Sequence, residues 1–254
     1  MGQAGMMEQS YTAVAALYDR LNGPEIYRQF ASRICHLLRQ KGIQDGLVLE
    51  LACGTGTLAR ALSQEGYEMI CCDSSVEMLS VAREKCQDLP VPPVFICQDM
   101  RELDLYGTVR AAVCCLDSMN YLTDIESVRA AVEGVSLFME TGGIFIFDVK
   151  SREMFRQMAG QSNVYEDDDC YCVWQYGYDG RSGFGQHLVD IFFRQQDGSY
   201  VRHQEVHEQR AYSRAKLEQI LQDAGFVLEG VYRDLSSRRA TEEQGRLLFV
   251  ARKR

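Results

Sequence analysis

The chain has 254 residues, of which 46% are hydrophobic and 25% charged, with only four prolines, so it is a folded chain with one large domain or a domain plus an insertion, and not a disordered one. Its 27 Lys and Arg against 36 Asp and Glu give a formal net charge of -9, which disfavours a broad electrostatic grip on nucleic acid or anionic lipid. No stretch approaches the roughly 20 apolar residues that cross a bilayer, and residues 1–10 do not have the pattern of a signal peptide, so we expect a cytoplasmic protein without a membrane anchor.

Ten cysteines raise the question of disulfides. Five of them lie in apolar runs that are typical of buried strands, namely Cys71, Cys72, Cys97, Cys114 and Cys115. Cysteine in such a run behaves as a small hydrophobic residue, so the sequence predicts reduced thiols in the core.

Strands and helices alternate through the first part of the chain. Residues 9–41 carry two helical patterns, the second of which follows Pro24. We then expect strands at 47–51, 69–72, 94–97, 111–116 and 144–149, and helices at 57–64, 75–86 and 125–138, the last closed by Gly142-Gly143. This alternation predicts a parallel sheet that helices cover on both faces.

The pattern changes after Ser151. Long strands are predicted at 170–178, 184–195 and 200–212, joined by the hairpin signals Asp179-Gly180 and Asp197-Gly198. A helix at 213–224, ended by Gly225, and strands near 226–232 and 247–251 follow. We therefore divide the chain into a helical cap with a core (1–160), an antiparallel β insertion (161–212) and a final helix and strands that complete the core (213–254). The acidic run 166–169 is interpreted as a solvated loop or strand edge.

A glycine-containing turn follows the first predicted strand. Gly54 and Gly56 let the backbone approach a ligand, and Asp73 ends the next strand, where a carboxylate accepts from ribose hydroxyls. Taken alone, this loose GxGxxG/A pattern suits a nicotinamide dehydrogenase as well as an S-adenosylmethionine enzyme.

Three further features favour the second cofactor. Glu50 lies inside the first strand, where a carboxylate needs a loop amide or a cationic ligand. Gln98-Asp99-Met100 ends the third strand with a second acidic tip, suited to the amino group of a base. Residues 116–121 end the fourth strand with polar and aromatic groups at the ligand-binding edge of the sheet. Together they describe a nucleoside ligand without a pyrophosphate.

These residues resemble the motifs of class I S-adenosylmethionine-dependent methyltransferases. Residues 50–56 resemble the first motif of that family, Cys72-Asp73 its ribose-binding second motif and residues 98–100 its adenine-binding third motif. Residues 142–148 resemble the opening of its fifth strand, and Ala52-Cys53 depart from the pattern by a small-for-small exchange. The resemblance implies an α/β fold with a Rossmann-like, mostly parallel seven-stranded sheet, an N-terminal helical cap and the antiparallel β insertion.

Residues 18–21 and 192–212 resemble a bacterial subgroup of small-molecule methyltransferases that carry a β insertion over the active site. In that subgroup a tyrosine and an arginine of the cap hold the methionyl part of the cofactor, which implies these roles for Tyr18 and Arg33. The resulting set of cofactor-binding residues is Tyr18, Arg33, Glu50, Ala52, Cys53, Gly54, Gly56, Asp73, Ser74, Met78, Gln98, Asp99, Met100 and Leu116. The predicted substrate-binding residues are Tyr11, Asn120, Tyr121 and Trp174.

A general base is optional for this reaction because the methyl donor is already activated. The candidates are Asp117, His187, His203 and His207. His203, Glu205 and His207 alternate along one predicted strand, which suggests a metal site. On a straight strand the two histidines lie roughly 13 Å apart, too far for one ion, and we predict no metal.

The sequence thus predicts methyl transfer from S-adenosylmethionine to an oxygen or nitrogen atom of a small molecule. RNA and protein methyltransferases, an NAD-dependent oxidoreductase and a non-catalytic cofactor-binding module are the alternatives. Trp174 shares a strand face with Cys170, Cys172, Tyr176 and Tyr178, and His187 shares one with Val189, Ile191 and Phe193. We expect most of these to be packing residues, with an aromatic wall that closes on an acceptor as the alternative. The exposed strand edges of the insertion suggest a homodimer contact.

Overall fold

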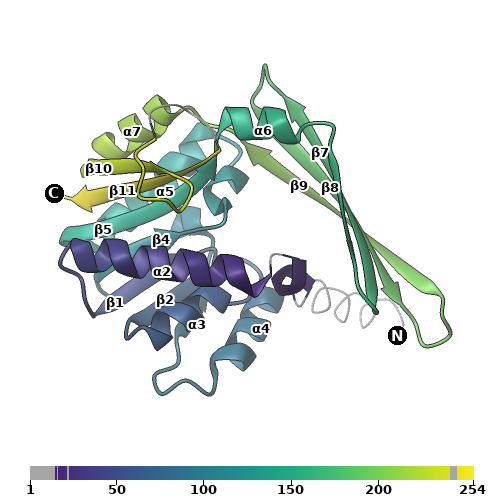
Figure 1. Ribbon diagram of the computed structural model, residues 1–254. Helices are drawn as coiled ribbons and strands as arrows, with labels where there is room; N and C mark the ends of the chain where they lie inside the picture. The colour runs from purple at the N-terminus through teal and green to yellow at the C-terminus, as the bar shows by residue number, and fades with distance from the viewer. Residues whose placement is uncertain (1–14, 16, 22, 241–244) are drawn as a thin grey trace.

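A computed structural model describes residues 15, 17–21, 23–240 and 245–254 of the chain. Seven strands form one sheet in the order β10-β11-β5-β4-β1-β2-β3 (Figure 1). The strands are β1 (Leu47–Leu51), β2 (Glu68–Asp73), β3 (Val94–Cys97), β4 (Val109–Cys114), β5 (Met139–Lys150), β10 (Phe226–Arg233) and β11 (Arg246–Lys253). The first five are mutually parallel, and β11 is antiparallel to both β5 and β10. The predicted seven-stranded, mostly parallel Rossmann-like sheet is confirmed.

Helices cover both faces of this sheet. The helices of the core are α2 (Pro24–Gln40), α3 (Thr57–Gln64), α4 (Val76–Cys86), α5 (Ile125–Leu137) and α7 (Arg214–Asp223). Successive strand residues point to opposite faces. Val48 accordingly packs with α2 and α3, whereas its neighbour Leu49 packs with α5 and α7. Among the described residues no helix is both long and apolar enough to traverse a bilayer.

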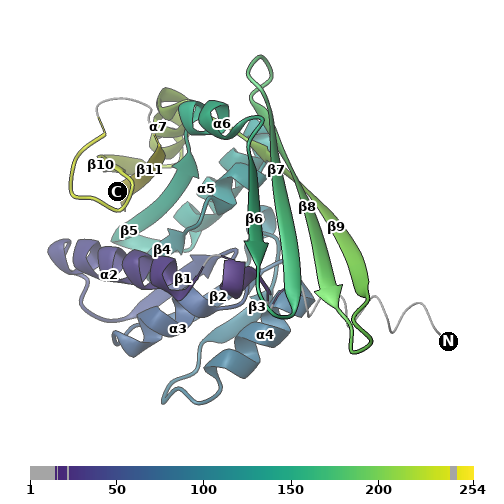
Figure 2. The same cartoon turned by 45° about the vertical axis from the view of Figure 1, so that its right-hand side comes forward.

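A second, antiparallel sheet leaves the core after β5. It consists of β6 (Ser162–Glu166), β7 (Cys170–Asp179), β8 (Phe184–Arg194) and β9 (Tyr200–Arg210), preceded by α6 (Arg152–Met158). The predicted hairpins at Asp179-Gly180 and Asp197-Gly198 are confirmed, because they join β7 to β8 and β8 to β9. This sheet stands beside the edge of the core at which the parallel strands end (Figures 1 and 2).

The inner face of the second sheet packs on the N-terminal helical segment. Leu17, only 1% exposed, forms a small apolar cluster with Cys170, Cys172, Val189 and Ile191. The strand faces predicted for the insertion are therefore confirmed for these residues, and they are core-like rather than free to touch a ligand.

Three sequence-based expectations are corrected. The fourth strand ends at Cys114, not at 116, because Leu116 and Asp117 adopt left-handed backbone angles, with φ of 59° and 61°. Gly142-Gly143 lie within β5 and do not close α5, which ends at Leu137. Cys97 is exposed, since β3 is the edge strand of the sheet.

Candidate cofactor and acceptor site

The glycine loop connects β1 to α3 and has the strained backbone that close ligand approach requires. Ala52, Gly54 and Gly56 all have positive φ, of 50°, 52° and 70°. A Cβ at Gly56 would lie 2.9 Å from Cβ of Ala82 on α4, so only glycine fits there. For Ala52 the left-handed conformation costs roughly 1–2 kcal/mol, which the rest of the fold must offset.

Asp73 at the tip of β2 fixes this loop. Its Oδ2 accepts a hydrogen bond from Gly54 N at 2.8 Å, and its Oδ1 accepts one from Ser75 N at 2.9 Å. An ionised carboxylate has about four lone-pair sites. Asp73 therefore retains acceptor capacity for the hydroxyls of a ribose beside the loop.

A cavity of about 240 Å³ opens next to Asp73. The predicted ligand-binding residues that line it are Ala52, Asp73, Ser74, Gln98, Asp99, Met100 and Tyr121. The structure thus joins the ends of β1, β2, β3 and β4 in one pocket, as expected for an open α/β sheet. A larger hollow of about 730 Å³ lies between α2 and α3 and shares no residue with it.

Asp99 is held by a residue that the sequence analysis did not select. Its Oδ1 accepts from Arg101 Nε at 2.9 Å and its Oδ2 from Arg101 Nη2 at 2.6 Å, and this pairing holds the pKa of Asp99 below its ordinary value. Gln98 bonds through both side-chain atoms to the backbone of Asp104. Recognition of an adenine amino group by Asp99 would therefore compete with Arg101.

Glu50 is a buried carboxyl group, 4% exposed, within β1. Burial, with a smaller contribution from the charge of Asp73, raises its pKa to about 8. Among the described residues its hydrogen-bond donor is the thiol of Cys71, with Sγ 4.0 Å from Oε2. A buried acid with so weak a partner fits a cationic ligand group, and S-adenosylmethionine carries a sulfonium and an ammonium.

Gly54, Gly56 and four further predicted cofactor residues do not line the pocket. Met78 donates its backbone N–H to Ser75 Oγ at the start of α4. Arg33 lies 4.9 Å over the ring of Tyr232, and its Nε is buried without a hydrogen-bond partner among the described residues. Cys53 is buried in the core, and Leu116 packs against the same α2–α3 cluster.

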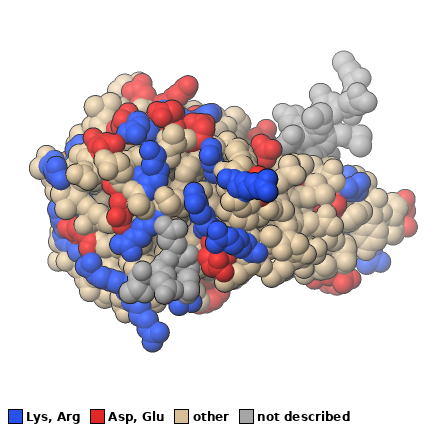
Figure 3. Space-filling model, turned by 90° about the horizontal axis from the view of Figure 1, so that it is seen from above, with Lys and Arg blue, Asp and Glu red and all other residues tan. Residues whose placement is uncertain are grey.

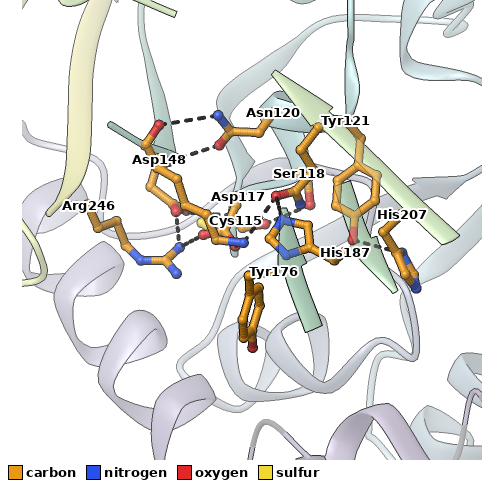
Figure 4. Close-up of polar contacts among 12 residues, drawn as sticks. Cys115, Asp117, Ser118, Asn120, Tyr121, Asp148, Tyr176, His187, His207 and Arg246 are labelled. Atoms are coloured by element: carbon orange, nitrogen blue, oxygen red, sulfur yellow. Dashed lines mark hydrogen bonds and ion pairs between the residues drawn. The ribbon is translucent and has the colours of Figure 1, made fainter. Parts of the chain in front are cut away.

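Asp117 is part of an ion-pair network and does not have the surroundings of a general base (Figure 4). Its Oδ2 lies 2.8 Å from Lys150 Nζ, and Arg246 bridges Asp117 and Asp148. Burial by itself would raise the pKa of Asp117, but Arg246 and Lys150 outweigh it and hold the pKa below its ordinary value. A carboxylate stabilised by two cations is a weak base, so the geometry does not support the catalytic hypothesis.

Asn120 is fully buried and its side chain binds backbone. Its Nδ2 donates to Arg210 O at 2.8 Å and to Lys150 O at 3.3 Å, and its Oδ1 accepts from Lys150 N at 2.8 Å. The residue joins β5 to β9. It has no free polar group for the substrate contact that the sequence suggested.

Two of the histidine candidates lie away from the cavity. His187 is 2% exposed, is 3.1 Å from Gln209 Oε1 through its Nε2, and packs on Tyr176. Burial, followed by the charge of Lys150, lowers the pKa of His187 to about 4. His203 packs edge-on against Phe193, at the far end of β9. Tyr11, predicted to bind substrate, lies outside the described residues.

His207 is the candidate that contacts a residue of the cavity wall. Its Nδ1 lies 3.1 Å from Oη of Tyr121, which lines the pocket, and its Nε2 lies 2.9 Å from Oη of Tyr18 and 2.9 Å from Oε2 of Glu205. Trp174 stacks on the imidazole with ring centres 5.8 Å apart. Tyr18 and Trp174, predicted for cofactor and substrate, are thus brought together at the junction of the two sheets.

Comparisons with known proteins agree with this geometry. A family model described as a methyltransferase domain matches residues 48–143. A candidate methyltransferase of Bacillus subtilis (strain 168), YqeM, is 33% identical over 245 residues, which are 96% of this chain and 97% of that protein. A crystal structure of an S-adenosylmethionine-dependent methyltransferase from Clostridium acetobutylicum ATCC 824 has a TM-score of 0.85 at 27% identity, covering 96% of this chain and 99% of its own. A Streptomyces venezuelae enzyme described as dTDP-3-amino-3,4,6-trideoxy-alpha-D-glucopyranose N,N-dimethyltransferase is 27% identical over 226 residues, covering 88% and 93% of the two chains.

Proposed function

Because the chain belongs to the class I S-adenosylmethionine-dependent methyltransferases, we propose that it methylates an oxygen or nitrogen atom of a small molecule. The observation that carries this proposal is the pocket at the strand ends, where Asp73 faces the glycine loop and Tyr121 faces the second sheet. When bound, S-adenosylmethionine supplies a methyl group on a positively charged sulfur. The protein has to bind the two reactants in line and exclude water.

The residues present fit this cofactor. The glycine loop offers backbone to it, and Asp73 offers carboxylate oxygens to its ribose hydroxyls. Glu50 offers a buried acid that becomes ionised beside a cation. Met100 offers an apolar surface to the purine from the far side of the pocket.

The acceptor side favours a small molecule over a macromolecule. Tyr121 lines the pocket and packs edge-on against His207, on which Trp174 stacks, so aromatic rings border the pocket on the side of the second sheet. Figure 3 shows acidic and basic side chains interspersed on the face seen from above, rather than one basic field. Phosphate-rich polymers bind to continuous basic surfaces. An amino sugar such as the substrate named for the Streptomyces venezuelae relative belongs in the first set of acceptors to be tested.

The decisive experiment is to incubate the pure protein with S-adenosylmethionine labelled in its methyl group and with separated small-molecule, RNA and protein fractions of a bacterial extract. We expect label in the small-molecule fraction and none in the same fraction with Asp73→Ala protein. Label confined to RNA or protein would overturn the proposed acceptor class. Cofactor binding without labelling of any fraction would make the chain a binding module, and tight binding of NADH in place of S-adenosylmethionine would make it an oxidoreductase.

We also propose that the chain forms a homodimer through the outer face of the second sheet. The strands β6 and β9 are edges of this sheet, and Val164 on β6 and Val206 on β9 are 57% and 53% exposed. Unpaired edges and exposed aliphatic residues favour pairing with another chain. Light scattering should give twice the chain mass, and Val206→Lys should reduce it to one chain mass. A monomeric mass for the unmodified protein would overturn the proposal.

A cytoplasmic location is the remaining proposal. All ten cysteines lie in the described part of the chain and are free thiols. Cysteine-rich proteins with free thiols are typical of reducing compartments. Recovery of the protein in an oxidising, extracytoplasmic fraction of fractionated cells would contradict it.

A further inference from the structure

Three residues from two distant parts of the chain form a continuous hydrogen-bonded line that ends in the pocket. Tyr121 lies in the short helix η2 (Ser118–Tyr121) after β4, whereas His207 and Glu205 lie on β9. Oη of Tyr121 is 3.1 Å from Nδ1 of His207, and Nε2 of His207 is 2.9 Å from Oε2 of Glu205. The line therefore connects the core with the inserted sheet, and Figure 4 shows its first contact, between Tyr121 and His207.

The partners of Glu205 assign the direction of these hydrogen bonds. Oη of Tyr18 donates its proton to Oε2 of Glu205 at 3.1 Å, so Nε2 of His207, 2.9 Å from both oxygens, faces two acceptors and carries the imidazole proton. With its proton on Nε2, the neutral imidazole presents the lone pair of Nδ1 to the hydroxyl of Tyr121. This is the order acid, imidazole, hydroxyl that activates the hydroxyl group in hydrolase triads.

The two ends of the line differ in exposure. Tyr121 is 43% exposed and lines the pocket together with Ala52 and Asp73. The side chains of His207 and Glu205 are only 14% and 24% exposed, and Trp174 stacks on the imidazole. An incoming acceptor can therefore reach the phenol but not the imidazole.

We propose that Tyr121 is a catalytic residue that passes the proton of the acceptor to His207, which Glu205 positions. The inference rests on the proposed methyl transfer. As the acceptor heteroatom forms its bond to the methyl carbon, the sulfur–carbon bond breaks and its electron pair goes to sulfur. The proton of the heteroatom moves to Oη of Tyr121 while the phenolic proton moves to Nδ1 of His207, and the resulting imidazolium is paired with the Glu205 carboxylate until the proton leaves to water.

The charges around the relay suit this direction. Partial burial, followed by the negative charge of Asp117, raises the pKa of Tyr121 above its ordinary value, so a phenolate is disfavoured. The phenol therefore takes up the proton of the acceptor as its own proton moves to Nδ1 of His207. Glu205 on β9 lies 2.9 Å from Nε2 and supplies a counter-charge to a protonated imidazole. His187, the register partner of His207 on β8, stays neutral and does not oppose it. Tyr18 contributes a neutral hydroxyl, since burial and the charge of Glu205 raise its pKa as well.

The test uses the full-length protein, methyl-labelled S-adenosylmethionine and the small-molecule fraction that accepts label. Positioned acid–base groups contribute roughly 100- to 10,000-fold to a rate. We expect Tyr121→Phe and His207→Gln each to lower single-turnover methyl transfer at pH 7 by at least about 100-fold, with the cofactor affinity unchanged within about twofold. The matched controls Tyr106→Phe and His36→Gln, at exposed positions outside the site, should retain full activity.

The pH profile separates a relay from a structural role. In the unmodified protein the single-turnover rate should rise with pH and reach a plateau once a single group has lost its proton. In His207→Gln the rate should instead keep rising with hydroxide concentration up to pH 9. Glu205→Gln should lower the plateau rate, because the imidazolium loses its counter-charge, and should leave the plateau itself in place.

Three outcomes would overturn the relay: full activity of either variant, an unchanged pH profile in His207→Gln, or a loss of cofactor affinity equal to the loss of rate. If the unmodified protein labels no fraction, the proposed function itself fails. Normal labelling by Tyr121→Phe is a different result, because it refutes the relay and leaves the proposed function intact.

Discussion

Thr55 of the glycine loop donates from Oγ1 to Oδ1 of Asp19 in the N-terminal helical segment, at 2.6 Å. Thr57 donates to the same oxygen at 2.8 Å, and Lys85 of α4 pairs with the other oxygen. The residue before Asp19 is Tyr18, which bonds to Glu205 of the insertion. One turn of helix thus connects the cofactor loop with the second sheet.

Replacing Asp19 by Asn should weaken cofactor binding about tenfold, equivalent to about 1.4 kcal/mol. The substitution removes the charge that pairs with Lys85 and weakens both hydroxyl hydrogen bonds that hold the glycine loop. Calorimetric titration with S-adenosylmethionine measures the change. Asp88→Asn, which loses an exposed ion pair with Arg60, is the control and should bind the cofactor normally. Equal affinity of the two variants would show that Asp19 does not hold the glycine loop in its binding conformation.

Replacing Tyr18 by Ala should reduce the affinity for S-adenosylmethionine more than tenfold. The change removes the phenol that bonds Glu205 and His207 and the ring that packs edge-on against Trp174 at 6.4 Å. Tyr18→Phe keeps the ring and loses only the hydroxyl, so it separates the two contributions. Unchanged affinity of the Ala variant by calorimetry would remove Tyr18 from the cofactor site.

The stability of the cofactor-free protein should fall as the pH rises from 6 to 8, in part because of Glu50. Burial raises the pKa of this carboxyl from 4.5 to about 8, so between these values the folded state binds a proton that the unfolded chain has lost. One such proton changes the free energy of unfolding by about 2 kcal/mol over these two pH units.

Glu50→Gln should remove this component, and the exposed Glu84→Gln should retain it. Denaturant titrations of the three proteins at pH 6, 7 and 8 provide the measurement. Parallel pH dependence of the unmodified protein and Glu50→Gln would show that Glu50 does not hold the proton.

Replacing Asn120 by Ala should lower the free energy of unfolding by about 3 kcal/mol. The variant leaves the buried backbone groups of Lys150 and Arg210 without their partner, and buried groups left unpaired cost roughly 1–3 kcal/mol each. Urea unfolding measures the loss, with Asn163→Ala on the exposed strand β6 as the neutral control. Normal stability combined with a raised KM for the acceptor would instead restore Asn120 to the substrate site.

Local signals identified the cofactor half of the site. The bounds of β1, α3 and β3 were predicted from apolar runs and glycines, and Asp73 was placed beside the loop because it ends the next strand. The helix α6 and the strand β6 were missed. Most of β6 is exposed and is stabilised by pairing with β7, so its residues carry no apolar period of their own.

The acceptor half depends on partners that the sequence does not place together. Arg246 reaches Asp117 only because β11 lies between β5 and β10, and His207 reaches Tyr121 only because the insertion crosses the edge of the core. The alternation of strands and helices predicted the parallel α/β core, because it depends on short local runs of residues. The glycine loop alone left two cofactors open, and the acidic strand ends at 50, 73 and 99 together with the resemblance to the methyltransferase motifs decided between them. Tertiary packing decided which acids pair with cations, which histidine contacts Tyr121 at the pocket and which asparagine is only structural. The physical reason is that charge pairing and burial depend on residues some 30 to 190 positions apart in the chain.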